Sequence, residues 1–254
     1  MMRTRPVLWI RTLVFYIGYA CWTALWGTSL TVIAQFVPRR LRFNVVIVPW
    51  VSLVLWWLKV TCGIQVEVHG KEHLGQEPGI LLMKHMSTWD ALYSQLLVSP
   101  QTTVIKRKLL WIPCFGWAFW VTNPIAIDRE QRMSALRFIV AEGRKRLAAG
   151  VWVTLFPEGT RIPSGEVGKF QRGGAMLAKQ SGVPTYLVAH NGGHYWRTNA
   201  FIKHPGVIQV RISPPQQVGE RTSQDFNDDA ESWMREQMVE LDQIALEGNI
   251  QRRN

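Results

Sequence analysis

The segment GILLMKHMSTWD, residues 79–90, joins a short apolar run to His85 and, five residues later, to Asp90. A wholly apolar run of this length, opened by glycine, is typical of a strand buried on both faces of a sheet. On a helix, residues five apart are separated by about 140°, so the chain must bend between the histidine and the aspartate. Ser87 fits the N-cap of a helix that starts at Thr88 and carries Asp90 in its first turn.

Short apolar runs and helical patterns alternate from residue 60 onward. We expect strands at residues 64–68, 79–83, 103–105, 125–127, 151–156, 184–189 and 207–212. Helices are expected at residues 90–97, 132–148, 174–180 and 227–246, and the last of these places Ala230, Met234, Met238, Leu241 and Ala245 on one face. This alternation predicts an α/β fold in which helices pack on a sheet.

Polar or charged side chains follow four of the expected strands. They are His85, Lys106, Arg129 and Glu158. In open α/β sheets the carboxyl ends of parallel strands line the ligand crevice. If these strands are parallel, the four side chains lie along one edge of the sheet.

Two apolar stretches precede this region, at residues 13–37 and 45–58, with a basic patch at 38–42 between them. Tryptophan is enriched at the membrane headgroup boundary, and six of the thirteen tryptophans lie before residue 58. A signal peptide is excluded because the first stretch is too long and runs into arginines. We therefore expect a membrane-associated two-helix motif at residues 1–60 and an α/β domain at 61–254. The alternative is a helical hairpin buried inside the globular domain.

The two stretches are expected to enter one leaflet from the cytoplasmic side without crossing the membrane. The second contains Pro49 and, as a helix, would measure roughly 21 Å against a bilayer core of ~30 Å. Arginines also flank the first stretch on both sides, so the positive-inside rule gives no crossing direction. A hairpin within one leaflet keeps both basic clusters at the same anionic surface.

The formal net charge of +11 favours an anionic partner. Arginines are spread along the chain and no nucleic-acid-binding signature is present, so we expect membrane lipid rather than nucleic acid. Cys21, Cys62 and Cys114 are scattered, which indicates a reducing compartment. His190 and His194 have i,i+4 spacing, but the glycines between them interrupt any helix that would align them on a metal. We expect no metal and no other cofactor.

A histidine with an aspartate beside it can act as a general base. The carboxylate accepts from one ring nitrogen and fixes the tautomer, which leaves the other nitrogen free to take a proton. A substrate alcohol can supply the nucleophile, whose proton His85 removes as it attacks an activated acyl carbon. The alternative is that Ser87 and Asp90 only cap a helix and His85 is a loop residue.

A second motif, FPEGTR at residues 156–161, follows a later strand. Gly159 allows a sharp turn there, and Arg161 offers a planar, bidentate donor for phosphate. HxxxxD at residues 85–90 followed by FPEGTR resembles the motif order of the glycerolipid acyltransferases. The family's second and fourth blocks resemble Lys106 to Pro113 with Gly116, closing at Ile127-Asp128-Arg129, and Val183-Pro184.

The resemblance covers most of residues 60–215 and implies a mixed sheet flanked by helices, with an N-terminal two-helix membrane motif. The resemblance implies that His85 is the base and that Asp90 is its orienting partner. It implies that Glu158, with Gly159 of the same motif, binds the substrate by contacting the glycerol backbone. It also implies that Lys106, Arg129 and Arg161 are phosphate ligands. The chain departs from the family pattern in places. Lys84 precedes the histidine where asparagine is common, Lys108 replaces a common acidic residue, and Asn123-Pro124 stands where glycine is usual.

The reaction that the resemblance implies moves a fatty acyl chain to the sn-2 hydroxyl of lysophosphatidic acid, at the cytoplasmic face of a bacterial inner membrane. The donor is a thioester of acyl carrier protein (ACP) or of coenzyme A. Two alternatives stay open: acylation of another lysolipid, such as a lyso-ornithine lipid or lysophospholipid, and anionic-lipid binding without chemistry. The apolar segment Leu109 to Trp120 is expected to line an acyl tunnel, to face lipid or to join the core.

Overall fold

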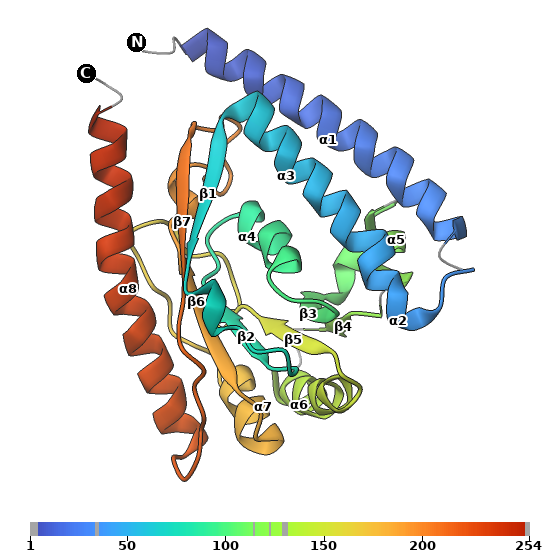
Figure 1. The fold of residues 1–254 in the computed structure, drawn as a ribbon, viewed down its shortest axis with the longest axis vertical. Helices are drawn as coiled ribbons and strands as arrows, with labels where there is room; N and C mark the ends of the chain where they lie inside the picture. The colour runs from blue at the N-terminus through green and yellow to red at the C-terminus, as the bar shows by residue number, and fades with distance from the viewer. Residues whose placement is uncertain (1–4, 34–35, 114, 122, 129–131, 252–254) are drawn as a thin grey trace.

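The computed structural model describes residues 5–33, 36–113, 115–121, 123–128 and 132–251. Within them, seven strands form one sheet in the order β1-β7-β6-β2-β5-β3-β4 (Figure 1). The strands are β1 (Ile64–His69), β2 (Ile80–Met83), β3 (Gln101–Lys106), β4 (Ile125–Ile127), β5 (Trp152–Leu155), β6 (Thr185–His190) and β7 (Gly206–Ile212). All seven lie where the apolar runs of the sequence predict them.

The sheet is mixed, as expected. Strands β6, β2, β5, β3 and β4 are mutually parallel neighbours. Strand β7 runs antiparallel to β6 and parallel to β1. The four strands that precede the predicted polar residues therefore share one direction, and their carboxyl ends lie at one edge of the sheet.

Helices cover both faces of this sheet (Figure 1). One layer contains α6 (Arg132–Ala148), α7 (Gly173–Ser181) and α8 (Ser223–Gln251), and the other contains α1 (Arg5–Ile33), α3 (Val48–Cys62) and α4 (Thr88–Tyr93). Side chains alternate along a strand, so Ile80 and Leu82 of β2 join the core with α6, α7 and α8, while Leu81 and Met83 join the core with α1, α3 and α4. The predicted apolar face of α8 is buried at all five positions.

The second apolar stretch forms a longer helix than the sequence suggested. A π-helical turn, η1 (Phe43–Ile47), continues into α3, so the apolar helical segment covers 20 residues from Phe43 to Cys62. Pro49 does not end the helix: the π-helical turn directly precedes it, and helical backbone continues through it to Cys62. The expectation that this stretch is too short to span a bilayer was therefore wrong. By length and composition alone, this segment and Arg5–Ser29 of α1 are both apolar enough to cross a membrane.

Much of the apolar surface of α1 is exposed. In the most apolar part of Arg5–Ser29, 11 % of the residues are buried inside the protein. The corresponding share for Phe43–Cys62 is 44 %. A second exposed apolar segment comprises η4 (Arg107–Trp111) and α5 (Phe115–Val121). Of these two, α5 packs against α1. There Trp111 is 82 % and Trp120 70 % exposed, so these side chains do not belong to the core. Exposed apolar side chains therefore continue from the N-terminal helix onto the α/β part.

A buried lysine links α1 to the loop that follows β6. The backbone N–H of Lys203 donates to Thr12 Oγ1 of α1 at 3.0 Å, and its ammonium donates to the carbonyls of Ala200 and Phe201. The ammonium also lies over the ring of Tyr16, 5.0 Å from its centroid. The same loop reaches the segment that carries the HxxxxD motif, because Thr198 Oγ1 donates to the carbonyl of Met86 at 2.9 Å.

Candidate active site

His85 and Asp90 form a hydrogen-bonded pair just beyond the carboxyl end of β2. Nδ1 of His85 lies 2.9 Å from Oδ1 of Asp90, whose side chain is fully buried, whereas the imidazole is 14 % exposed. Because the carboxylate only accepts, Nδ1 carries the proton and Nε2 has its lone pair available. The ring of Phe156, just after β5, stacks on the imidazole with centroids 4.2 Å apart. The imidazole is thus held between Asp90 and Phe156.

The capping arrangement is present together with this pair. Ser87 is the N-cap of α4, and its hydroxyl accepts from the N–H of Trp89 at 2.9 Å. Oδ2 of Asp90 accepts from the N–H groups of Met86 and Ser87, both at 2.7 Å. The capping contacts and the contact with His85 are therefore not exclusive, because each is made by a different oxygen of one carboxylate.

The charge state of Asp90 follows from these contacts. Burial alone would raise the pKa of Asp90, but the neighbouring His85, supported by His190 and the amide of Met86, outweighs it and lowers the pKa. The carboxylate is consequently ionised at neutral pH and can stabilise a protonated His85.

His190, at the end of β6, is a third member of the site. From the sequence, its spacing to His194 raises only the question of a metal. Its side chain is fully buried, and burial lowers the pKa of His190 to about 4 despite the nearby Asp90. Nδ1 accepts from the N–H of Gly192 at 3.1 Å, so the proton lies on Nε2, 2.9 Å from the carbonyl of Lys84. One feature of the sequence indicates that His190 lies at the site: it directly follows a predicted strand, as Lys106 does.

Glu158 follows β5, the neighbour of β2, and lies beneath His85. Its carboxylate accepts from Lys84 Nζ at 2.7 Å, from the N–H of His85 at 2.8 Å and from the N–H of Gly168 at 2.9 Å. The side chains of Lys84 and Glu158 are both fully buried. Three protein donors thus contact this carboxylate, and the glycerol contact that the family resemblance implies for Glu158 stays a prediction.

Two of the three predicted phosphate ligands, Lys106 and Arg161, lie at the same edge of the sheet as His85. Lys106 ends β3 and is exposed, and Arg161 is exposed beyond the turn that Gly159 makes with φ +70°. That positive φ accounts for the glycine. Arg129 lies outside the described residues.

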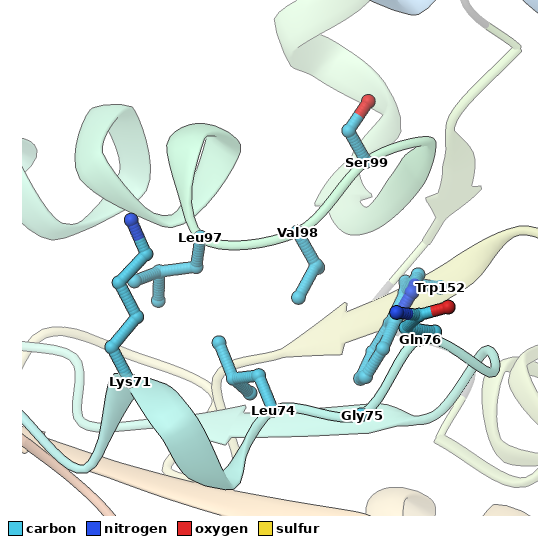
Figure 2. Close-up of a pocket in the computed structure, with 8 residues that line it drawn as sticks. All are labelled: Lys71, Leu74, Gly75, Gln76, Leu97, Val98, Ser99 and Trp152. Atoms are coloured by element: carbon cyan, nitrogen blue, oxygen red, sulfur yellow. The ribbon is translucent and has the colours of Figure 1, made fainter.

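A depression of about 390 Å³ lies elsewhere on the molecule (Figure 2). Trp152, the first residue of β5, forms part of its wall, so it opens at the amino ends of the parallel strands, away from His85. Among the described residues, no group of three or more histidine, cysteine, aspartate or glutamate side chains is placed to hold a metal ion.

Comparisons with known proteins bear on the family and the fold. A family model described as Acyltransferase matches residues 65–191. The chain is 41 % identical, over 92 % of its length and 93 % of the relative's, to the 1-acyl-sn-glycerol-3-phosphate acyltransferase of Pseudomonas aeruginosa. The human 1-acyl-sn-glycerol-3-phosphate acyltransferase alpha is 32 % identical, over 75 % of this chain and 68 % of that protein.

A solved structure shows the same fold. The crystal structure of the 1-acyl-sn-glycerophosphate (LPA) acyltransferase PlsC from Thermotoga maritima superposes with a TM-score of 0.75 at 23 % identity, covering 91 % of this chain and 95 % of that one. Together with the matched family model and the Pseudomonas relative, this fold leads to one conclusion: the chain belongs to the Acyltransferase family.

Proposed function

We propose that the protein transfers a fatty acyl chain from acyl-ACP or acyl-CoA to the sn-2 hydroxyl of lysophosphatidic acid, giving phosphatidic acid. The names of its relatives support this acceptor. The observation that carries the proposal is the 2.9 Å contact between His85 Nδ1 and Asp90 Oδ1, which leaves Nε2 of a partly exposed imidazole as a base.

The reaction needs no covalent enzyme intermediate. Nε2 of His85 takes the hydroxyl proton of the acceptor as its oxygen attacks the thioester carbonyl. The new C–O bond forms, the C–S bond breaks, and the proton passes from the imidazolium to the departing sulfur. Asp90 stabilises the imidazolium in between, since its carboxylate stays ionised. General base catalysis of this kind contributes about 10² to 10⁴ in rate.

Acceptor binding is assigned to the cations at the carboxyl edge of the sheet. Lys106 and Arg161 are exposed there and offer charge to the phosphate monoester of lysophosphatidic acid. Arg129 has the same role by family resemblance. A lysolipid without a terminal phosphate would lose these contacts.

The decisive experiment is an acyl-transfer assay with purified protein, lysophosphatidic acid and each thioester donor in turn. We expect phosphatidic acid as the product, and His85→Ala to retain less than about a tenth of the turnover while still binding lysophosphatidic acid. A lyso-ornithine lipid and lysophosphatidylcholine serve as acceptors without a phosphate monoester. Preference for either would replace the proposed acceptor, and lipid binding without any transfer would indicate a non-catalytic lipid-binding protein.

We also propose that the N-terminal helices enter one leaflet from the cytoplasmic face. Basic residues at both ends of the first apolar stretch support this orientation, because both clusters then meet the same anionic surface. Leu41, between the helices, is 45 % exposed. In intact cells, Leu41→Cys in a background without Cys21, Cys62 and Cys114 should react with an impermeant thiol reagent only after lysis. The control is Val239→Cys on α8 in the same background, and labelling of Leu41→Cys from outside would replace the leaflet model with a transmembrane hairpin.

A further inference from the structure

A buried ion pair lies directly behind the catalytic histidine. Lys84 Nζ and Glu158 Oε1 are 2.7 Å apart, and neither side chain is exposed. Removing two charges from water is costly, and replacing such a pair by apolar side chains is often neutral or stabilising. The stability of the fold therefore does not account for this ion pair.

The neighbouring contacts supply that explanation. Glu158 Oε2 accepts the N–H of His85 at 2.8 Å, and His190 Nε2 donates to the carbonyl of Lys84 at 2.9 Å. This N–H and this carbonyl belong to one peptide unit, the one that joins Lys84 to His85. The unit is thus held from both sides, and its plane sets the direction in which the Cα–Cβ bond of His85 points.

We propose that Glu158, Lys84 and His190 are positioning residues that clamp the Lys84–His85 peptide unit, and that Glu158 acts on catalysis through this clamp without contacting the acceptor. Lys84 holds one oxygen of the carboxylate, so that the other faces the N–H of His85. His190 is neutral, so it donates its Nε2 proton without adding charge. The inference rests on the proposed role of His85 as the base.

Substitutions of the ion pair distinguish a clamp from a substrate contact. In Glu158→Gln the amide offers one acceptor oxygen where the carboxylate offers two, and its NH₂ group must face either Lys84 or the N–H of His85. We expect kcat to fall about 10²-fold, the cost of a small misplacement of a reacting group, while KM for lysophosphatidic acid stays within about twofold. Lys84→Met, which leaves the carboxylate unpaired, should act in the same direction.

The double variant Lys84→Met/Glu158→Gln gives the sharper result. Without the ammonium, a glutamine oxygen turned to the N–H of His85 leaves the NH₂ group facing only the N–H of Gly168 and no longer Lys84 as well, so kcat should be several-fold higher than in Glu158→Gln alone. A matched control exists on α6, where Lys145 and Glu142 form an exposed pair at the same 2.7 Å separation. Lys145→Met and Glu142→Gln should leave kcat and KM within about twofold of wild type.

Hydrogen exchange of residues 84–90, followed by mass spectrometry, reports on the clamp independently of turnover. Exchange should be faster in Glu158→Gln and slower again in the double variant. If wild type transfers no acyl chain but this pattern appears, the proposed function fails and the clamp stands. Three results would each overturn the clamp: unchanged exchange in Glu158→Gln, a tenfold rise in KM for lysophosphatidic acid at unchanged kcat, or a kcat of the double variant no higher than that of Glu158→Gln alone.

Discussion

The carboxylate of Asp90 faces two imidazoles, with His190 Nε2 lying 3.7 Å from Oδ2 while His85 Nδ1 lies 2.9 Å from Oδ1. The two rings differ in access, since His85 is partly exposed and His190 is fully buried. Burial lowers the pKa of His190 to about 4, so it stays neutral at physiological pH. Only His85 is therefore placed to exchange a proton with a substrate.

The buried His190 should make stability depend on pH. Its pKa is lower in the folded protein than the ordinary value of about 6.5, so between pH 6.5 and 4 the unfolded chain binds a proton that the folded protein does not. The free energy of unfolding should thus fall by up to about 3 kcal/mol as pH drops through this window. In His190→Gln, denaturant unfolding across the window should show a shallower dependence. The exposed His69→Gln is the control, and an unaltered slope in His190→Gln would contradict the assignment.

Asp90→Asn should lower kcat by about 10³- to 10⁴-fold. The amide oxygen can replace Oδ2 as the acceptor from Met86 and Ser87, which turns the NH₂ group towards His85 Nδ1. The imidazole would then carry its proton on Nε2 and could not act as a base.

Steady-state kinetics test this, with Asp242→Asn as the control. Asp242 pairs with His194 at 2.6 Å in a second histidine–aspartate contact outside the site. Wild-type turnover in Asp90→Asn would leave Asp90 with the capping role alone.

Arg161→Lys should raise the apparent KM for lysophosphatidic acid about tenfold, the effect of losing one hydrogen bond to a charged group. An ammonium cannot reproduce the bidentate fork of a guanidinium. The measurement is an acceptor titration at saturating donor, repeated with the donor varied. Arg235→Lys on the exposed side of α8 is the matched substitution. A rise in KM for the donor alone would reassign Arg161 to donor recognition.

Trp111→Ser and Trp120→Ser should each weaken binding to phosphatidylglycerol vesicles by about 1 kcal/mol, roughly fivefold. Both side chains are largely exposed, Trp120 on α5, which packs against α1, and Trp111 on η4, which packs against α5; an amphipathic ring suits the headgroup boundary. Vesicle sedimentation measures the effect. Val239→Ser removes an apolar side chain of similar exposure from α8, on the other side of the sheet (Figure 1). Equal losses in all three variants would show that these tryptophans have no particular membrane contact.

Local patterns were sufficient to predict the strands and the helix that carries Asp90. The period of apolar residues locates strands independently of their partners, and Ser87 with Asp90 defines a helix start by contacts within four residues. The sequence predicts polar residues along one edge of the sheet if their strands are parallel; β2, β5, β3 and β4 are parallel, which brings His85, Glu158 and Lys106 to that edge. The roles assigned to these side chains stay predictions.

Strand order was not readable from the sequence, and it decides the remaining contacts. Lys84 meets Glu158 because β2 lies next to β5, and it meets His190 because β6 lies on the other side of β2. These residues are 74 and 106 positions from Lys84 along the chain, and no local pattern links them. The effect of Pro49 was not readable either, because helical backbone continues through it after the π-helical turn at residues 43–47, which no local pattern predicts.

The loop that holds Lys203 has a practical consequence for handling the protein. A shortened chain that begins near residue 60 would lack Thr12, the acceptor for the N–H of Lys203, and Tyr16, the ring beneath its ammonium. The loop so released is the one whose Thr198 donates to the carbonyl of Met86, the residue after His85. A water-soluble form for crystallisation or solution NMR should therefore keep α1 and replace its exposed apolar side chains, such as Ile10, Ile17 and Leu25, with polar ones.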